Sequence, residues 1–248
     1  MRMLAFASRN RKELTRDPLT LLFGVGFPVV LLILMTIINN SVSAATGVAD
    51  TTPQFQMDNL MPGMMVFGLS FLSLFGGMLI AGDRDNSFLM RLFSSPLSAW
   101  DYIAGYALPI FLVALAQSII CIGVGVALGA TLSWRLLLAL VAVLPAAFLY
   151  VGFGLLLGSV FSYRQVGGVS SILINLAAWM SGTWFQLELI GGGFKAVCNI
   201  LPFANAVDLV RKAFSGSGDV LANLLITLAW ASVIFVLATV VFKKKMKQ

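Results

Sequence analysis

The chain has no histidine and only two cysteines among its 248 residues. Without an imidazole it has no histidine general base, histidine metal ligand or Ser–His–Asp triad. Cys121 and Cys198 are too few for a zinc or iron–sulfur site built from several cysteines. These absences exclude the enzyme classes whose chemistry depends on imidazole or on a multi-cysteine metal centre.

Charge is also scarce, because only 10% of the residues are Asp, Glu, Lys or Arg. Soluble domains carry roughly 25%. Hydrophobic residues make up 59% of the chain, which is more than a soluble protein of this length can bury. The composition excludes a soluble enzyme and a disordered chain, and it indicates a polytopic membrane protein.

Six apolar runs are long enough to cross a bilayer core of about 30 Å, which takes roughly 20 residues per helix. None of the six contains Asp, Glu, Lys or Arg, so a proton-coupled carrier and a voltage sensor are disfavoured. No GxxxxGK[ST] phosphate-binding loop occurs in the chain, so ATP would have to be hydrolysed by another chain. The predicted spans are residues 19–38, 60–81, 103–130, 136–161, 166–186 and 220–242.

The distribution of basic residues predicts the orientation of these spans. Twelve of the 16 lysines and arginines fall in the N-terminus, the 82–102 loop, the 162–165 turn and the C-terminal tail, and four fall on the other side. Cytoplasmic segments carry the excess of Lys and Arg, so we expect both termini in the cytoplasm. An even number of spans agrees with this placement.

Residues 1–18 alternate apolar and basic side chains, which predicts an amphipathic helix on the cytoplasmic membrane surface. The simpler alternative is a positive flank that orients the first span. Asp17 and Pro18 are expected to end this helix, and the basic residues include Arg11 and Arg16. No small-residue cleavage site follows, so we expect the first apolar run to remain as a span.

The 82–102 loop is the largest predicted cytoplasmic loop. Its apolar side chains at 88, 89, 92 and 93 share one helix face, acids precede them and Pro96 follows. Such a helix could insert into a groove on a cytoplasmic partner or could rest on lipid. The candidate contact residues are Asp83, Arg84, Asp85, Phe88, Leu89, Arg91, Leu92 and Pro96.

Two further features lie near the other face of the membrane or within the spans. Residues 187–219 contain short apolar pieces, which predict re-entrant helices or a hairpin resting on lipid. Gln117, Asn175 and Ser181 are polar residues within or near the spans. They are candidates for a translocation path, while the alternative is hydrogen bonding to a neighbouring helix.

Three segments together resemble the membrane permease of type-2 ATP-binding-cassette (ABC) exporters. Residues 13–34 (ELTRDPLTLLFGVGFPVVLLIL) look like the family's connecting helix, its Arg-Asp-Pro break and its first span. Residues 83–96 (DRDNSFLMRLFSSP) look like its coupling helix, although Ser87 and Phe88 stand where the family has Gly-Thr. Residues 200–214 (ILPFANAVDLVRKAF) look like the stretch before its last span.

The resemblance implies an all-α membrane protein. Residues 1–248 would form a single permease domain with both termini in the cytoplasm. It would carry six spans, an N-terminal interfacial helix, a cytoplasmic coupling helix and short re-entrant helices. It also implies two ABC ATPase subunits, a second permease of the same or a homologous kind, and ATP with Mg on the ATPase rather than on this chain. No metal site and no nucleic-acid partner are expected.

The function expected from this resemblance is export across a bacterial-type cytoplasmic membrane. A path without intramembrane charge suits an amphiphilic drug, an antimicrobial peptide or a lipid-like compound. Two alternatives remain open. The same machinery could export a polysaccharide or a lipid-linked glycan, or the chain could be a self-sufficient six-span carrier or channel.

Overall fold

The computed structural model describes residues 2–46, 55–86 and 99–245. The coupling-helix residues Phe88, Leu89, Arg91, Leu92 and Pro96 lie outside them. Within the described residues the regular elements are helical. They are α1 (Arg2–Arg16), α2 (Pro18–Leu21), the π-helix η1 (Leu22–Gly26), α3 (Phe27–Thr46), α4 (Met57–Asp85), α6 (Ala99–Ala127), α7 (Arg135–Val160), α8 (Tyr163–Met180), α9 (Leu187–Ile190), α10 (Gly192–Ile200), α11 (Pro202–Ser215) and α12 (Val220–Lys245).

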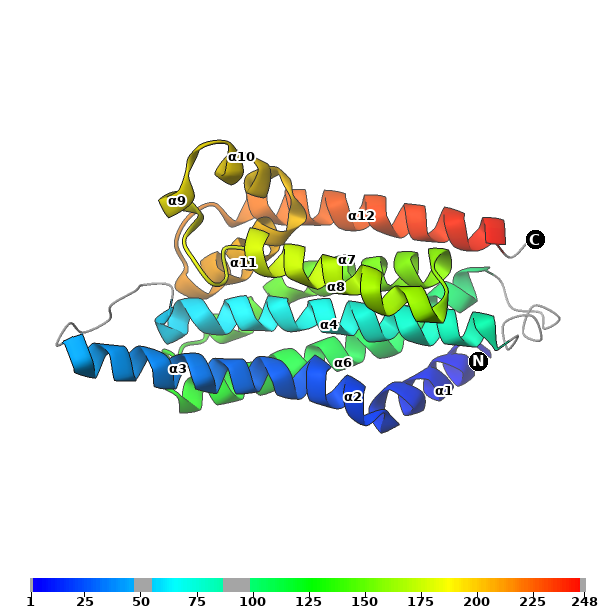
Figure 1. Cartoon of the computed structure of the whole chain (residues 1–248), viewed down its shortest axis with the longest axis horizontal. Coiled ribbons are helices and arrows are strands. Elements are labelled where there is room, and N and C mark those ends of the chain that lie inside the picture. Colours follow the sequence, from blue (N-terminus) through cyan, green and yellow to red (C-terminus); the bar gives the residue numbers. More distant parts are fainter. Residues whose placement is uncertain (1, 47–54, 87–98, 246–248) are drawn as a thin grey trace.

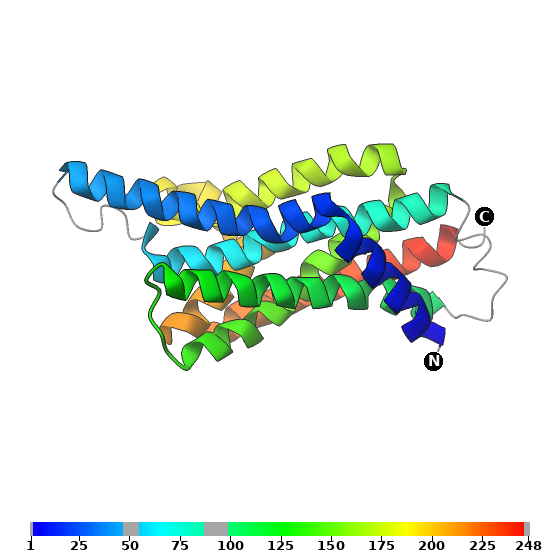
Figure 2. The same cartoon turned by 90° about the horizontal axis from the view of Figure 1, so that it is seen from below.

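The long helices lie side by side in an elongated bundle, with α4 at its centre (Figures 1 and 2). Five helical stretches of the described chain are long and apolar enough to cross a membrane. A sixth crossing arises if α10 and α11, which meet at an angle of 78°, count as one span. The five stretches are Pro18–Thr46, α4, α6, α7 and α12. The prediction of an all-helical membrane protein is confirmed.

In two functionally relevant places the helices end at other residues than the predicted spans. The second long helix does not stop at residue 81 but continues to Asp85, so the acids expected to begin the coupling helix form the last turn of α4. The fifth predicted span, residues 166–186, is α8, which already ends at Met180. It is also not among the five membrane-length stretches, because Arg164, Gln165 and Asn175 make it more polar.

Glycines allow α4 and α7 to pack backbone to backbone. A Cβ added at Gly158 would lie 2.6 Å from the carbonyl oxygen of Gly77, and one at Gly154 would lie 2.7 Å from that of Ser73. Small residues permit this approach between membrane helices, whose association depends on close packing. The interface fixes α7 against the central helix along much of its length.

The N-terminal segment turns sharply between α1 and α2, as Figure 2 shows. Asp17 adopts an extended conformation there, and its carboxylate accepts hydrogen bonds from the backbone N–H groups of Leu19 and Thr20. Pro18 occupies the first position of α2, where its missing N–H costs nothing. The predicted break at Asp17–Pro18 is therefore confirmed.

Both termini lie at the same end of the bundle, together with α1 and the last turn of α4 (Figure 1). We call this the terminal end. The short helices α9, α10 and the start of α12 lie at the opposite end. The two ends carry different polar clusters, and these clusters are the candidates for function.

Candidate functional site

An ion pair at the terminal end connects α1 to the last turn of α4. Arg9 contacts both carboxylate oxygens of Asp83, with Nη2 at 2.7 Å from Oδ1. The hydroxyl of Tyr106, on α6, donates to the same carboxylate at 2.8 Å. The Asp83 side chain is only 6% exposed, so it depends on these two partners for its hydrogen bonds. The contact joins three helices at one point.

Apolar contacts place α1 so that this ion pair can form. Phe6 is buried and packs edge-to-face on Tyr106, with ring centroids 4.9 Å apart. Any side chain at position 105 would overlap with the Phe6 ring, so only glycine leaves room for that ring. The buried amide of Asn10 donates to the Gly105 carbonyl at 3.0 Å. The expected amphipathic helix therefore packs on α6 as well as presenting a basic face.

Glu13 extends this cluster along α1. Its carboxylate lies 2.7 Å from Nη2 of Arg9, one helical turn away. Partial burial raises the pKa of Glu13, and the charge of Asp83 adds to that rise, while Arg9 opposes it. We refer to Arg9, Asn10, Glu13, Asp83 and Tyr106 as the α1 anchor.

The residues next to Asp83 attach the same turn of α4 to the neighbouring helix pair. Arg84 donates to the backbone carbonyls of Ser159 and Phe161, each at 2.6 Å, and so binds the end of α7. Asp85 accepts a hydrogen bond from the backbone N–H of Tyr163, at the start of α8. The turn from which the predicted coupling segment departs is thus bonded to α1, α6, α7 and α8.

A cavity of about 660 Å³ with a mixed polar and apolar lining lies between α1–α2 and the ends of α4 and α8. Carboxylates and two arginines surround part of it, and Phe75, Met78 and Leu79 form its apolar wall. Its charged lining residues are Arg9, Glu13, Asp17, Asp83, Asp85 and Arg164. A chamber with both a charged and an apolar wall is suited to a ligand with both characters.

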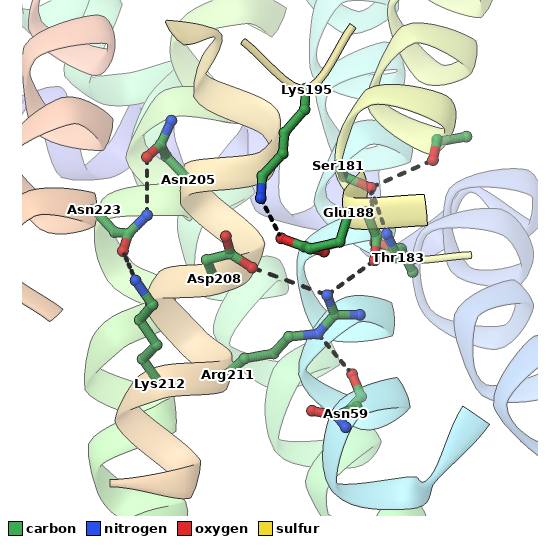
Figure 3. Close-up of polar contacts among 12 residues, drawn as sticks. Asn59, Ser181, Thr183, Glu188, Lys195, Asn205, Asp208, Arg211, Lys212 and Asn223 are labelled. Carbon is green, nitrogen blue, oxygen red and sulfur yellow. Dashed lines mark hydrogen bonds and ion pairs between the residues drawn. The ribbon is translucent and has the colours of Figure 1, made fainter. Parts of the chain in front are cut away.

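A second cluster, at the opposite end, centres on Arg211 of α11 (Figure 3). Its guanidinium donates to the backbone carbonyls of Asn59 at 3.0 Å and Gly182 at 2.9 Å, and it lies 4.0 Å from the Asp208 carboxylate. Nη2 is buried without a hydrogen-bond partner among the described residues. Gly63 leaves room for this nitrogen, since a Cβ at position 63 would lie 3.3 Å from Nη2 of Arg211. Arg211 thus ties α11 to α4 and to the turn after α8.

Amide contacts tie α11 to the last long helix in the same region (Figure 3). Asn223 of α12 donates to the side chain of Asn205 at 2.9 Å and accepts from Lys212 at 2.7 Å. Between α9 and α10, the ammonium group of Lys195 lies 3.0 Å from the carboxylate of Glu188 and lowers the pKa of that carboxyl. The bent pair α10–α11 is therefore bonded to its neighbours.

The three residues proposed for a translocation path lie in different environments. Gln117 is buried and donates to the Met65 carbonyl of α4 at 3.3 Å, which is the interhelical hydrogen bond considered as its alternative. Asn175 is on the exposed face of α8 and donates within its own helix. Ser181 is buried in the turn after α8, 2.8 Å from the hydroxyl of Thr183. No hydrogen bond in the described part of the chain joins any two of the three.

The residues proposed for the connecting helix divide into two groups. Arg11 and Arg16 are exposed on α1, whereas Asp17 and Pro18 form the start of α2. Sequence reasoning missed Arg9, Asn10 and Tyr106. The available signal was the spacing of Phe6, Asn10 and Leu14, which places an amide on the buried face of a basic helix.

A bundle of membrane-length apolar helices, with its charged clusters at the two ends, is a multi-pass membrane protein. The model of the ABC-2 type transporter family matches residues 1–215, and the chain belongs to this family. The comparison with curated proteins gives no match. Permeases of the ABC-2 family are membrane subunits that work with an ABC ATPase.

Proposed function

We propose that the chain is the permease subunit of an ABC exporter. It would move an amphiphilic compound outward across a bacterial-type cytoplasmic membrane, using ATP hydrolysed on a separate chain. The terminal end would face the cytoplasm and the ATPase. The observation that carries the proposal is the bonding of the α4 end to four other helices, in a chain that belongs to the ABC-2 family.

This bonding supports a specific path for force. A movement of the partner ATPase against residues 87–96 would reach α4 through Asp85, the last residue of that helix. From there the hydrogen bonds of Arg84 and Asp85 lead to α7 and α8, and the ion pair of Asp83 leads to α1. Motions pass between sites through such bonded and packed networks.

The cavity beside this turn supports an amphiphilic substrate. Its wall combines charged groups with Phe75, Met78 and Leu79, and it lies at the end of the bundle where an inward-facing entrance would be expected. A drug, an antimicrobial peptide or a lipid-like compound has the matching division into polar and apolar parts. A lipid-linked glycan also has a polar and an apolar part, and it is the alternative substrate.

The first experiment is purification of the tagged chain in mild detergent, followed by mass spectrometry. A stoichiometric partner that carries GxxxxGK[ST] is expected. A second, different permease in the complex would indicate a heterodimer, and one permease species would indicate two copies of this chain. A chain that transports in liposomes without ATP and without a partner would overturn the proposal in favour of a self-sufficient carrier.

The second experiment tests the coupling segment. In the purified complex, the double variant Phe88→Glu/Leu92→Glu should abolish substrate-stimulated ATP hydrolysis and export while the permease still reaches the membrane. Two charges on an apolar docking face cannot be buried without a large desolvation cost. The matched control is Ser87→Glu/Ser94→Glu, which adds the same charge on the opposite side of the predicted helix. Equal loss in both variants, or in neither, would contradict the assignment.

A further inference from the structure

An apolar groove of about 750 Å³ runs along the outside of the bundle between α6, α7 and α12. Its walls are aliphatic and aromatic side chains, among them Ile103, Ala107, Phe111, Phe148, Phe235 and Val240. Phe148 and Phe235 stack with their ring centroids 4.1 Å apart and narrow the groove on the α7 side. Nothing in the α1 anchor or the Arg211 cluster uses this surface.

The length of the groove matches one leaflet of a bilayer. On α6 the lining runs from Trp100 to Phe111, eleven positions further on. At 1.5 Å per residue this distance is about 16 Å. One leaflet of a hydrocarbon core roughly 30 Å thick is about 15 Å deep. A single acyl chain can therefore lie along the groove from the terminal end to the bundle's middle.

The end of the groove at the terminal end is positively charged. Trp100 lines it, and the ammonium group of Lys243 lies 5.6 Å from the centre of the Trp100 ring. Lys244 is exposed next to it. Asp101, in the first turn of α6, carries the opposite charge, so the two lysines leave this mouth cationic. Tryptophan and lysine together suit the headgroup level of a membrane.

We infer that this groove is a binding site for one anionic phospholipid, with an acyl chain between α6 and α12 and the phosphate group at Lys243 and Lys244. A neutral zwitterionic lipid fits the apolar walls equally well but lacks the net negative charge. Each lysine near the headgroup is therefore expected to favour the anionic lipid by roughly fivefold. The inference rests on the placement of the chain in a membrane and needs neither the ATPase nor the substrate.

Native mass spectrometry of the full-length chain in detergent tests the site, with phosphatidylglycerol and phosphatidylcholine added in equal amounts. The wild-type chain is expected to retain phosphatidylglycerol preferentially. Lys243→Glu/Lys244→Glu should lower the ratio of bound phosphatidylglycerol to phosphatidylcholine by about 25-fold or more. Both lysines are exposed, so this variant should fold. The matched control, Arg11→Glu/Lys12→Glu, makes the same charge change at exposed positions of α1 and should lower the ratio much less than the lysine variant.

A second pair of variants tests the apolar part. Ala107→Phe places a ring in the groove and should lower retention of both lipids, whereas Ala229→Phe, at an exposed position of α12 outside the groove, should not. Unchanged lipid selectivity in the lysine variant, or an equal loss in the α1 control, would overturn the proposed site. Because the readout is lipid mass, failure here is distinguishable from failure of the exporter assignment, which is read from the ATPase partner and transport.

Discussion

Arg9 differs from the other basic residues of α1 whose side chains the structure describes. Arg11, Lys12 and Arg16 are exposed, but Arg9 contacts the buried carboxylate of Asp83 and the carboxylate of Glu13. A basic residue that orients a span needs only its charge. One that neutralises a buried acid has a fixed position and fixed partners, so its loss should affect folding as well as orientation.

We predict that Arg9→Ala lowers the free energy of unfolding by about 2 kcal/mol, because among the described residues it leaves the Asp83 carboxylate with only the Tyr106 hydroxyl as a partner. The effect should stay below that of a fully buried ion pair, since the Arg9 side chain is 37% exposed. Unfolding of the purified chain in detergent measures the change. Arg11→Ala removes the same charge from an exposed position and should be nearly silent. Equal effects of the two substitutions would refute the anchor.

At the scale of the helices, the close packing of α4 on α7 depends on glycine. The nearest atoms to a Cβ at Gly158 are the carbonyl oxygen and Cα of Gly77 and the Cβ of Ile80, and none of these can rotate away. An added methyl group must therefore separate the two helices. This interface lies directly before the carbonyls that bind Arg84, so a displacement of α7 would also disturb the end of α4.

Gly158→Ala should therefore destabilise the chain by about 1–3 kcal/mol, the usual cost of overpacking a core. Gly123→Ala is the matched control, because a Cβ at Gly123 meets nothing within 4 Å and its helix α6 continues on both sides. That substitution should be neutral or stabilising by up to about 1 kcal/mol. Thermal unfolding of both variants in the same detergent provides the comparison. A harmless Gly158→Ala would show that the helices are further apart.

The helices also show which parts of the fold could be predicted from the sequence. Apolar runs and the Asp17–Pro18 pair are local patterns. The runs correctly indicated helices, and the pair correctly indicated the break between α1 and α2. The extension of α4 through Gly82–Asp85 was not predictable, because contacts with α1, α7 and α8 stabilise that polar turn. Arg9 and Asp83 are 74 positions apart, and no spacing rule within one segment connects them.

At the scale of the whole molecule, the arrangement of the ends constrains the topology. The N-terminus and C-terminus lie at one end of the bundle, and the turn between α11 and α12 lies at the other (Figure 1). A chain inserted along the long axis of this bundle must expose these two regions on opposite sides of the membrane. The excess of basic residues near the termini favours the cytoplasm for the terminal end.

Cysteine labelling tests this placement directly. Thr15→Cys introduces an exposed thiol on α1, and Ser217→Cys introduces one between α11 and α12. Both native cysteines, Cys121 and Cys198, are fully buried, so the unmodified chain should give a low background. With a membrane-impermeant maleimide, Ser217→Cys should react in intact cells and Thr15→Cys only after permeabilisation. The reverse pattern would place the α1 anchor outside, where no ATPase could reach it, and the coupling proposal would fail with it. Labelling of both positions in intact cells would contradict a bundle that crosses the membrane along its long axis.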